Sequence, residues 1–323
     1  MADSQVRVGF VGCGVHAREV ILPAAQHAGL EFAAVCDLDK RLAQRVSRRF
    51  GAFRAYQDLG NMIDEMDLDA VLVCGPPEMH AEAAEIALSH GCHVWTEMPA
   101  APTAEEVVRI ADLADARGLV AQPGLMTRFA PACVRLREIV SREEFGPLHS
   151  IEVAWWPQKQ HGHDDPMLFD LPHALDLVRF IGGEVSRLCV ARATGDDSLA
   201  VAMQLQSGAV ATVSFGAPAA CPRERVAVAS ANAVATAEDR QTVTLRHCER
   251  EETSVWAARA CETSAEGNAG GAERVRGFLP AMEQFAAAVA GGDAQSASMR
   301  DAARALRLAE HVSANSGEMV DVG

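Results

Sequence analysis

Small residues near the N-terminus have the spacing of a phosphate-binding turn. The segment Gly12-Cys-Gly14-Val-His-Ala17 follows directly on the apolar run Val6–Val11, and a helix is expected to begin at Ala17. A strand, a glycine turn and a helix N-terminus together present backbone N–H groups and the positive end of a helix dipole to an anion. The spacing therefore predicts a dinucleotide pyrophosphate site, with a ligand-free glycine turn as the alternative. The residues expected to bind the cofactor here are Gly12, Gly14, Val15 and His16.

An acidic residue follows at the distance that a ribose-binding group would have. The second apolar run, Glu31–Cys36, ends in Asp37, about twenty residues past the glycines. A carboxylate there would accept hydrogen bonds from the ribose hydroxyls of NAD and would repel a 2′-phosphate. Lys40 and Arg41 are near enough in sequence to pair with such a phosphate. NAD is therefore the predicted cofactor, and NADP is the alternative.

A histidine and an aspartate in the second half of the chain could move protons. His173 and Asp176 are three residues apart, so on a helix they would share one face. An imidazole titrates near neutral pH, which makes His173 a candidate general acid or base. The alternative is a buried histidine held by a hydrogen bond. Asp176 is expected either to orient His173 or to have a structural role.

A polar loop, His161-Gly-His163-Asp164-Asp165, precedes this helix. Two histidines beside carboxylates could bind a metal ion with His173 as a third ligand. We instead expect a solvated loop that contacts the substrate, because spacing this short recurs by chance; no metal is predicted. Trp155 and Trp156, which end the preceding strand, could line a pocket or pack in the core. The substrate-binding candidates here are Trp156 and His161.

Composition bounds the fold and excludes some partners. At 323 residues the chain should form two domains, and with 49% apolar but only 5% aromatic residues their cores must consist of Ala, Val and Leu. A net charge of −15 argues against binding to nucleic acid. No apolar run is long enough to span a membrane, and residues 1–5 do not resemble a signal peptide. The expected partner is a small-molecule substrate.

The cysteines indicate the compartment. There are nine cysteines, an odd number. Several lie in or beside apolar strand-like runs and form no CxxC pair, so they are expected to be buried thiols: Cys13, Cys36, Cys74, Cys92 and Cys189. Thiols of this kind predict a reducing compartment and a cytoplasmic protein.

Strands and helices alternate as far as Pro123. This alternation predicts a doubly wound parallel sheet that binds ligands at the carboxyl ends of its strands. Two strands end at prolines, in Gly75-Pro76-Pro77 and in Glu97-Met98-Pro99. The further strands are expected at Asp69–Cys74, Cys92–Thr96 and Leu119–Gln122, and the helices at Ala17–Ala28, Lys40–Phe50, Asn61–Met66, His80–Ser89 and Thr103–Arg117.

The pattern changes after Gly124. Strand-like runs that follow one another with few helices predict an α+β domain with a large, mostly antiparallel open sheet. These strands are expected at Leu148–Trp156, Val185–Thr194, Leu199–Leu205, Ala209–Phe215, Arg225–Ser230 and Thr242–Arg246. Helices are expected at Pro131–Glu144, Phe169–Ile181, Val275–Ala290 and Met299–Asn315, and a loop at Glu262–Glu273.

The predicted domains are a dinucleotide-binding domain, residues 1–124, and a substrate-binding and oligomerisation domain, residues 125–323. The segments Ala200–Gln206 and Ala209–Phe215 carry small apolar residues on both faces. One face of this sheet would therefore remain an exposed apolar patch too large for a monomer. We expect a homodimer or homotetramer that is joined through it.

Several segments in this order resemble the glucose–fructose oxidoreductase/inositol dehydrogenase (Gfo/Idh/MocA) family over essentially the whole chain. They are Gly12–Ala17, Val35–Asp37, Asp69–His80, Gly91–Pro99 and His173–Asp176. The resemblance implies a nicotinamide cofactor in the first domain and hydride transfer at a carbon bearing a hydroxyl. It also implies that the second-domain sheet mediates oligomers. It places Gly75, Pro76, His80, Glu97 and Met98 near the cofactor, and makes Arg128 a candidate for binding an acidic substrate or the cofactor.

The sequence departs from this family at the expected reaction centre. Sugar dehydrogenases of the family carry Glu-Lys-Pro, and here Met98 replaces the lysine; a thioether has no proton to give. The usual Asp-x-Gly-x-His-x-x-Asp motif has Phe169 in place of its first aspartate, with Asp170 one residue late. One residue is about 100° of helix rotation, so Asp170 would need a distortion at Pro172 to point the same way.

Three functions are compatible with this pattern. The first is an NAD(P)-dependent oxidoreductase with a non-standard acid/base set, acting on a sugar-derived compound, ketone or imine. The second is a family member that uses bound nicotinamide in a net non-redox reaction, as a lyase or isomerase would, and the third is a non-catalytic dinucleotide-binding protein. The first is preferred, with His173 as acid/base, Asp176 beside it, His163 or His161 as the alternative proton donor, and Asp170 touching the substrate.

Overall fold

The fold is taken from a computed structural model of the chain. The residues that it describes are 5–157, 165–195, 198–217, 223–248, 253–257, 274, 276–292, 297–315 and 317–322. The chain divides into two compact units, residues 1–126 with 268–304 and residues 127–267 with 305–323. The sequence-based division lay at residue 124 and assigned everything after it to the second domain. The structure instead returns residues 268–304 to the first unit.

The first unit contains a six-stranded parallel sheet in the order β3-β2-β1-β4-β5-β6. This order reverses at β1 and β4, as in a doubly wound sheet, so the predicted fold class is confirmed. The strands are β1 (Arg7–Val11), β2 (Glu31–Cys36), β3 (Arg54–Tyr56), β4 (Ala70–Val73), β5 (His93–Thr96) and β6 (Ala121–Pro123).

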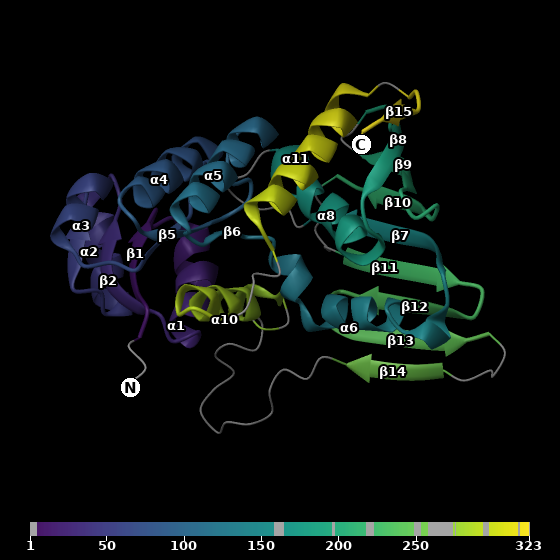
Figure 1. The fold of residues 1–323 in the computed structure, drawn as a ribbon, viewed down its shortest axis with the longest axis horizontal. Helices are drawn as coiled ribbons and strands as arrows, with labels where there is room; N and C mark the ends of the chain where they lie inside the picture. The colour runs from purple at the N-terminus through teal and green to yellow at the C-terminus, as the bar shows by residue number, and fades with distance from the viewer. Residues whose placement is uncertain are drawn as a thin grey trace. The chain divides into compact units, whose positions relative to one another are not determined.

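Helices cover both faces of this sheet. The helices of the unit are η1 (Ala17–Ile21), α1 (Leu22–His27), α2 (Lys40–Phe50), α3 (Leu59–Glu65), α4 (Pro77–Ser89), α5 (Ala104–Arg117) and α10 (Phe278–Val289). Figure 1 shows α4 and α5 along one side of the sheet and α1 with α10 along the other. Helix α10 belongs here because Phe278, Met282 and Phe285 are buried in the same core as Phe10 and Leu22.

Local signals explain where these helices begin and end. Asp39 caps α2 by accepting hydrogen bonds from the backbone N–H groups of Arg41 and Leu42. Thr103 and Glu106 form a reciprocal capping box at the start of α5. Helix α4 begins at Pro77, three residues before the predicted start, because a proline is tolerated in the first turn of a helix.

The second unit is built on a nine-stranded sheet in the order β14-β13-β12-β11-β7-β10-β9-β8-β15. Within the described residues of this sheet, only β7 and β10 pair in parallel, so the predicted mostly antiparallel sheet is confirmed. The strands are β7 (Leu148–Trp156), β8 (Val185–Arg192), β9 (Leu199–Leu205), β10 (Val210–Phe215), β11 (Arg223–Ser230), β12 (Ala233–Glu238), β13 (Thr242–His247), β14 (Thr253–Ala257) and β15 (Val320–Asp321).

One face of this sheet is covered. Helices α6 and α8 lie along it in Figure 1 and contact β7, β10, β12 and β13. The helical elements of the unit are α6 (Pro131–Val140), η3 (Glu143–Phe145), α7 (Pro166–Phe169), α8 (Leu171–Gly182) and α11 (Met299–Ala314), while η2 (Met126–Phe129) and α11 each cross the boundary between units. Strands β3, β12, β14 and β15 were not predicted. The sequence-based loop Glu262–Glu273 lies outside the described residues.

The opposite face is exposed, and it is a mixed surface rather than the uniformly apolar patch that the sequence suggested. Alternate residues of β9 and β10 point to it, and the register pairs Ala202 with Thr212, and Ala200 with Ser214. Further along the same face, Arg225 lies 3.8 Å from Glu152 and from Glu238. We predicted apolar side chains here; Val210 and Val234 are exposed as expected, but hydroxyls and ion pairs share the face with them.

The cysteine predictions hold in the first unit and fail at Cys189. Cys13, Cys36, Cys74 and Cys92 are buried and free, as expected. Cys189 is only half-buried, because it lies on the open face of β8, and its thiol donates to the carbonyl oxygen of Gly317 at 3.2 Å. Among the described residues, no helix combines the length and the apolar character that a membrane span requires.

Buried ion pairs hold α8 in the second unit. Arg128 donates from Nε and Nη2 to the two carboxylate oxygens of Asp176, at 2.7 and 2.6 Å. Arg179 also donates to Asp176, at 3.2 Å, and makes a two-pronged pair with Glu184. The side chains of Arg128, Asp176 and Arg179 are almost fully buried. Each charge is therefore balanced in place, and the loss of one would leave the others unpaired.

We expect Asp176→Asn to lower the free energy of unfolding by about 3 kcal/mol, because the buried guanidinium of Arg128 loses its two-pronged carboxylate and that of Arg179 loses one of its two. Urea unfolding followed by circular dichroism measures this. The matched control is Glu138→Gln, which breaks the exposed pair with Arg135 and should change stability by less than about 0.5 kcal/mol. An Asp176→Asn protein as stable as the wild type would show that this carboxylate has no structural role.

Candidate functional site

The two glycines of the turn after β1 have different surroundings: Gly12 is packed against the backbone, and Gly14 faces open space. Gly12 has φ +89°, and a Cβ there would lie 2.0 Å from the carbonyl oxygen of Cys74. No other residue fits this position without moving the backbone. At Gly14 the opposite holds, because nothing lies within 4 Å of the place of a Cβ. The turn is thus tight on its protein side and open on the side where a ligand would approach.

The carboxylate of Asp37 fixes this turn to the end of β2. Its Oδ2 accepts from the backbone N–H of Cys13 at 2.7 Å, and its Oδ1 accepts from that of Asp39 at 2.8 Å. A carboxylate oxygen has two acceptor positions, so each oxygen retains one for another donor. Asp37 is half-exposed, which leaves that capacity accessible. The geometry therefore fits both the turn and a diol ligand.

The helix after the turn begins with an irregular segment. The predicted helix Ala17–Ala28 starts as the π-helical turn η1 and continues as α1. Val15 is 67% exposed at its N-terminal end. His16 points to the neighbouring strand end, where its Nε2 lies 3.0 Å from Oε1 of Glu97. His16 and Glu97 thus link the glycine turn to the end of β5.

Glu97, Met98 and Pro99 follow β5. Oε2 of Glu97 accepts from the backbone N–H of Met98 at 3.0 Å, and the Met98–Pro99 peptide bond is cis. The side chains of Glu97 and Met98 are both buried. A buried thioether neither donates nor holds a proton, so Met98 offers no acid/base group at this edge of the sheet.

His80 ties the ends of β4 and β5 together. Its Nε2 accepts from the backbone N–H of Gly75 at 2.8 Å, so its Nδ1 must carry the proton that is donated to the carbonyl oxygen of Pro99 at 2.7 Å. Burial lowers the pKa of His80, which keeps the ring neutral. Pro76 is the N-cap residue of α4. His80 therefore positions two loops rather than titrating between them.

In the second unit His173 stacks on a tryptophan. Its ring is nearly parallel to the indole of Trp155, with centroids 6.4 Å apart and an interplanar angle of 6°. Side chains alternate along a strand, so Trp156 points to the other face of β7, where it fills the space over Gly216. We expected Trp156 to contact the substrate; the structure places Trp155, not Trp156, beside His173. The alternation of buried Ile151, Val153 and Trp155 carried this signal.

Asp170 lies at a break between two helices. Helix α7 ends at Phe169 and α8 starts at Leu171, so the distortion expected at Pro172 occurs slightly earlier. Burial raises the pKa of Asp170 to about 6, with a further increase from Glu224 and an opposing effect of Arg240. This carboxyl therefore changes charge near neutral pH. Sequence analysis singled out neither Glu224 nor Arg240.

Two other predicted site residues, Arg128 and Asp176, form an ion pair with each other. Asp176 was expected to orient His173 or to be structural, and its carboxylate is bound by Arg128 and Arg179, which supports the structural role. Arg128 was expected to bind an acidic substrate or the cofactor. Its Nε and Nη2 donate to Asp176, and its expected contact with a substrate or cofactor stays a prediction.

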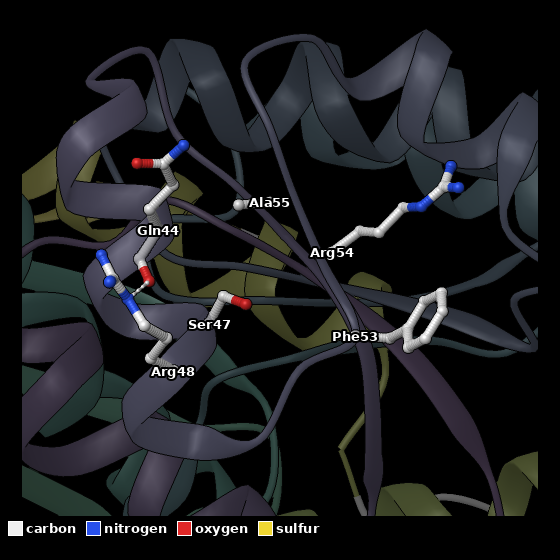
Figure 2. A pocket seen from close by; sticks show the side chains of 6 residues that line it. All are labelled: Gln44, Ser47, Arg48, Phe53, Arg54 and Ala55. Carbon is white, nitrogen blue, oxygen red and sulfur yellow. Dashed lines mark hydrogen bonds between the residues drawn. The ribbon is translucent and has the colours of Figure 1, made fainter.

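The remaining predicted site residues are the two histidines of the polar loop. His161 and His163 lie outside the described residues. Within the parts of the chain that the structure describes, no three His, Cys, Asp or Glu side chains are grouped so that they could hold a metal ion. The first unit has a shallow hollow of about 460 Å³, and none of the predicted site residues lines it. Figure 2 draws the side chains that line this hollow. Its lining consists of Gln44, Ser47, Arg48, Phe53, Arg54 and Ala55.

Comparison with known proteins identifies the first unit. Residues 6–125 match the Gfo/Idh/MocA model, described as an oxidoreductase family with an NAD-binding Rossmann fold. The chain is 28% identical to the rhizopine catabolism protein MocA of Rhizobium meliloti over 155 residues, 48% of each protein. It is 33% identical to the D-glucoside 3-dehydrogenase of Escherichia coli over 156 residues, 46% of this chain and 43% of that one. The chain thus matches less than half the length of these two relatives.

Solved structures match over nearly the whole chain. A dehydrogenase from Chromobacterium violaceum is 25% identical, with a TM-score of 0.85 over 97% of this chain and 96% of that one. A levoglucosan dehydrogenase in complex with NADH and L-sorbose has the same fold, with 19% identity and a TM-score of 0.85 over 99% of this chain and all of that one. The fold of the whole chain therefore has counterparts in known dehydrogenases. Residues 6–125 are thus similar to the NAD-binding Rossmann domain of the Gfo/Idh/MocA oxidoreductase family, and the whole chain has the fold of known dehydrogenases.

Proposed function

We propose that this protein is an NAD(H)-dependent oxidoreductase that acts on a small polar metabolite, namely a sugar-derived compound, a ketone or an imine. The observation that carries the proposal is the turn between β1 and α1, which Asp37 fixes while the space at Gly14 stays open. Relatives named as a D-glucoside 3-dehydrogenase and a levoglucosan dehydrogenase support the substrate class.

The turn and the strand ends would hold the cofactor. The backbone N–H groups near Gly14 suit a pyrophosphate, and the free acceptor positions of Asp37 suit the ribose hydroxyls. When bound, the nicotinamide supplies or takes up the hydride. Gly75, Glu97 and Met98 lie at neighbouring strand ends, where the cofactor's other half would extend.

A proton must accompany the hydride. Reduction of a carbonyl or imine places a proton on oxygen or nitrogen, and Met98 cannot provide it. His173 and Asp170 both can, since an imidazole titrates near neutral pH and burial raises the pKa of Asp170 to about 6. We assign the proton transfer to His173, with Asp170 close to the substrate. His161 and His163 are the alternative donors.

The methionine at position 98 also favours a second function. A buried methionine at the lysine position suits a protein that binds the nicotinamide but uses it in a net non-redox reaction, as a lyase or isomerase would, or not at all. These alternatives share the NAD site with the first proposal. They differ in whether hydride appears in the product.

We also propose a cytoplasmic protein. The free thiols of the described residues, five of them buried, suit a reducing compartment.

Cofactor choice tests the role of Asp37. We expect NADH to bind more tightly than NADPH in titration calorimetry, because the carboxylate would repel a 2′-phosphate. Asp37→Asn should weaken NADH binding about tenfold and reduce the preference, whereas the exposed control Asp67→Asn should do neither. Tighter binding of NADPH by the wild type would overturn the proposal.

Removal of the imidazole tests the proton transfer. His173→Ala should lower kcat by about 10²–10⁴-fold, the usual cost of losing a general acid or base. NADH affinity should be nearly unchanged. Met98→Lys should not create sugar dehydrogenase activity, because Phe169 leaves the ammonium without an aspartate neighbour and apolar surroundings penalise its charge. Full activity of His173→Ala would move the assignment to His161, His163, water or the substrate.

Assembly is the remaining proposal. We propose a homodimer or homotetramer joined through the open face of the nine-stranded sheet, where small side chains allow close approach. Light scattering at micromolar concentration should give a dimeric or tetrameric mass. Thr212→Arg, at the centre of this face, should reduce that mass, and a monomeric wild type would rule the interface out.

A further inference from the structure

An arginine occupies a turn position that favours glycine. Asp239 and Arg240 have φ values of +49° and +58°, and the backbone N–H of Gln241 donates to the carbonyl oxygen of Glu238 at 2.9 Å. This is the β12–β13 hairpin, and positive φ at both central residues is typical of a type I′ turn. A non-glycine residue in this region costs about 1–2 kcal/mol. The side chain of Arg240 must therefore contribute something in return.

That side chain is committed to Glu224. Nε of Arg240 donates to Oε2 and Nη2 donates to Oε1, both at 2.5 Å, and the pair is largely buried. The turn also fixes the backbone of Glu224, whose N–H donates to Oδ1 of Asp239 at 3.0 Å and whose carbonyl accepts from Asp239 N–H at 2.7 Å. A two-pronged pair of this kind holds the guanidinium plane in one orientation.

The guanidinium lies over the indole on which His173 stacks. Its central carbon is 5.2 Å from the ring centroid of Trp155. Trp155 is also the direct cross-strand partner of Glu224 in the β7–β11 register, so both side chains lie on the same face of the sheet. A continuous contact chain therefore runs from Glu224 through Arg240 and Trp155 to His173.

We propose that Arg240 is a positioning residue of the acid/base site: held by Glu224, it fixes the Trp155 indole against His173 and supplies a positive charge that acts on Asp170. The proposal rests on the proposed function for its catalytic consequence, but the positioning itself can be measured without activity. It explains why an arginine is kept at a strained turn position and why its charge is buried with its counter-ion.

The charges around Asp170 set the expected pH effects. Glu224 faces it from the start of β11 and Arg240 from the hairpin, while His173 follows on α8 and Cys133 of α6 lies near the guanidinium. Arg240 lowers the pKa of Asp170, and Glu224 raises it. Loss of Arg240 should therefore raise this pKa further above about 6, and loss of Glu224 should lower it.

Variants of Arg240 can separate the effect of its positive charge from the effect of its planar contacts with Glu224 and Trp155. Arg240→Asn removes the guanidinium with a residue that tolerates positive φ, and Arg240→Asn/Glu224→Gln also avoids an unpaired buried carboxylate. Arg240→Lys keeps the charge but loses the two-pronged pair and the planar contact with Trp155. The matched control is Arg135→Gln on the outer side of α6, which breaks an exposed pair with Glu138.

The first measurement is a pH titration of tryptophan fluorescence, which reports His173 because a protonated imidazole quenches a neighbouring indole. The signal lost in Trp155→Phe belongs to Trp155. Both Arg240→Asn and the double variant should lose at least half of that component, while circular dichroism and NADH affinity stay within twofold of the wild type. Arg135→Gln should retain the full component.

The second measurement is the pH profile of kcat. In Arg240→Asn the midpoint on the acidic side of the kcat–pH profile should rise by about one pH unit. The same variant should lower kcat about tenfold with little change in KM. In Arg240→Lys, which keeps the charge, this midpoint should stay where it is in the wild type. Unchanged fluorescence titrations in the folded double variant and in Arg240→Lys would overturn the proposal and leave Arg240 a purely structural residue. Because fluorescence needs no turnover, a wild type without oxidoreductase activity would contradict the proposed function without deciding this one.

Discussion

The first unit depends on the carboxylate of Asp37. By accepting from Cys13 N–H and Asp39 N–H, it joins the turn after β1 to the start of α2 and compensates two donors that no strand or helix pairs. Gly12 makes the join possible, since any side chain there would strike the Cys74 carbonyl. His80 and the His16–Glu97 pair extend the same principle to the ends of β4 and β5. The carboxyl edge of the sheet is thus pre-built, with the space at Gly14 left open.

In the second unit, different aspartates have different roles: Asp176 binds two buried arginines, whereas Asp170 has a raised pKa. Asp176 is bound by two buried arginines, which supports a structural role for its carboxylate. His173 stacks on Trp155, which Arg240 also contacts, while burial raises the pKa of Asp170 to about 6. Below that value the protonated carboxyl of Asp170 dominates and above it the carboxylate, so this group exchanges its proton at a higher pH than an exposed aspartate would. Asp170 and His173 are therefore our candidates for supplying the proton that Met98, at the family's lysine position, has no group to supply.

Sequence reasoning succeeded where the signal is local. The turn Gly12–Ala17 and the distance to Asp37 are set by one strand–turn–helix unit, and their prediction needed no tertiary information. It failed where distant segments meet. The strand Ala233–Glu238 is rich in alanine, a poor strand former, and its existence depends on the neighbours that it pairs with. Nothing local indicates that α10 returns to the first core, nor that Arg240 reaches Trp155, because four separate elements must assemble first. The face of Trp155, in contrast, was available from strand alternation.

The central claim is that this chain transfers hydride although its lysine position holds a methionine. The most direct test is turnover with NADH deuterated at C4, on both faces in turn, over a panel of sugars, ketones and imines, with products analysed by mass spectrometry. We predict one deuterium in the product from one of the two labelled cofactors, and none from the other. A product formed without deuterium from either cofactor would contradict the claim in favour of a non-redox reaction, and NADH binding without any turnover across the panel would contradict it in favour of a non-catalytic protein.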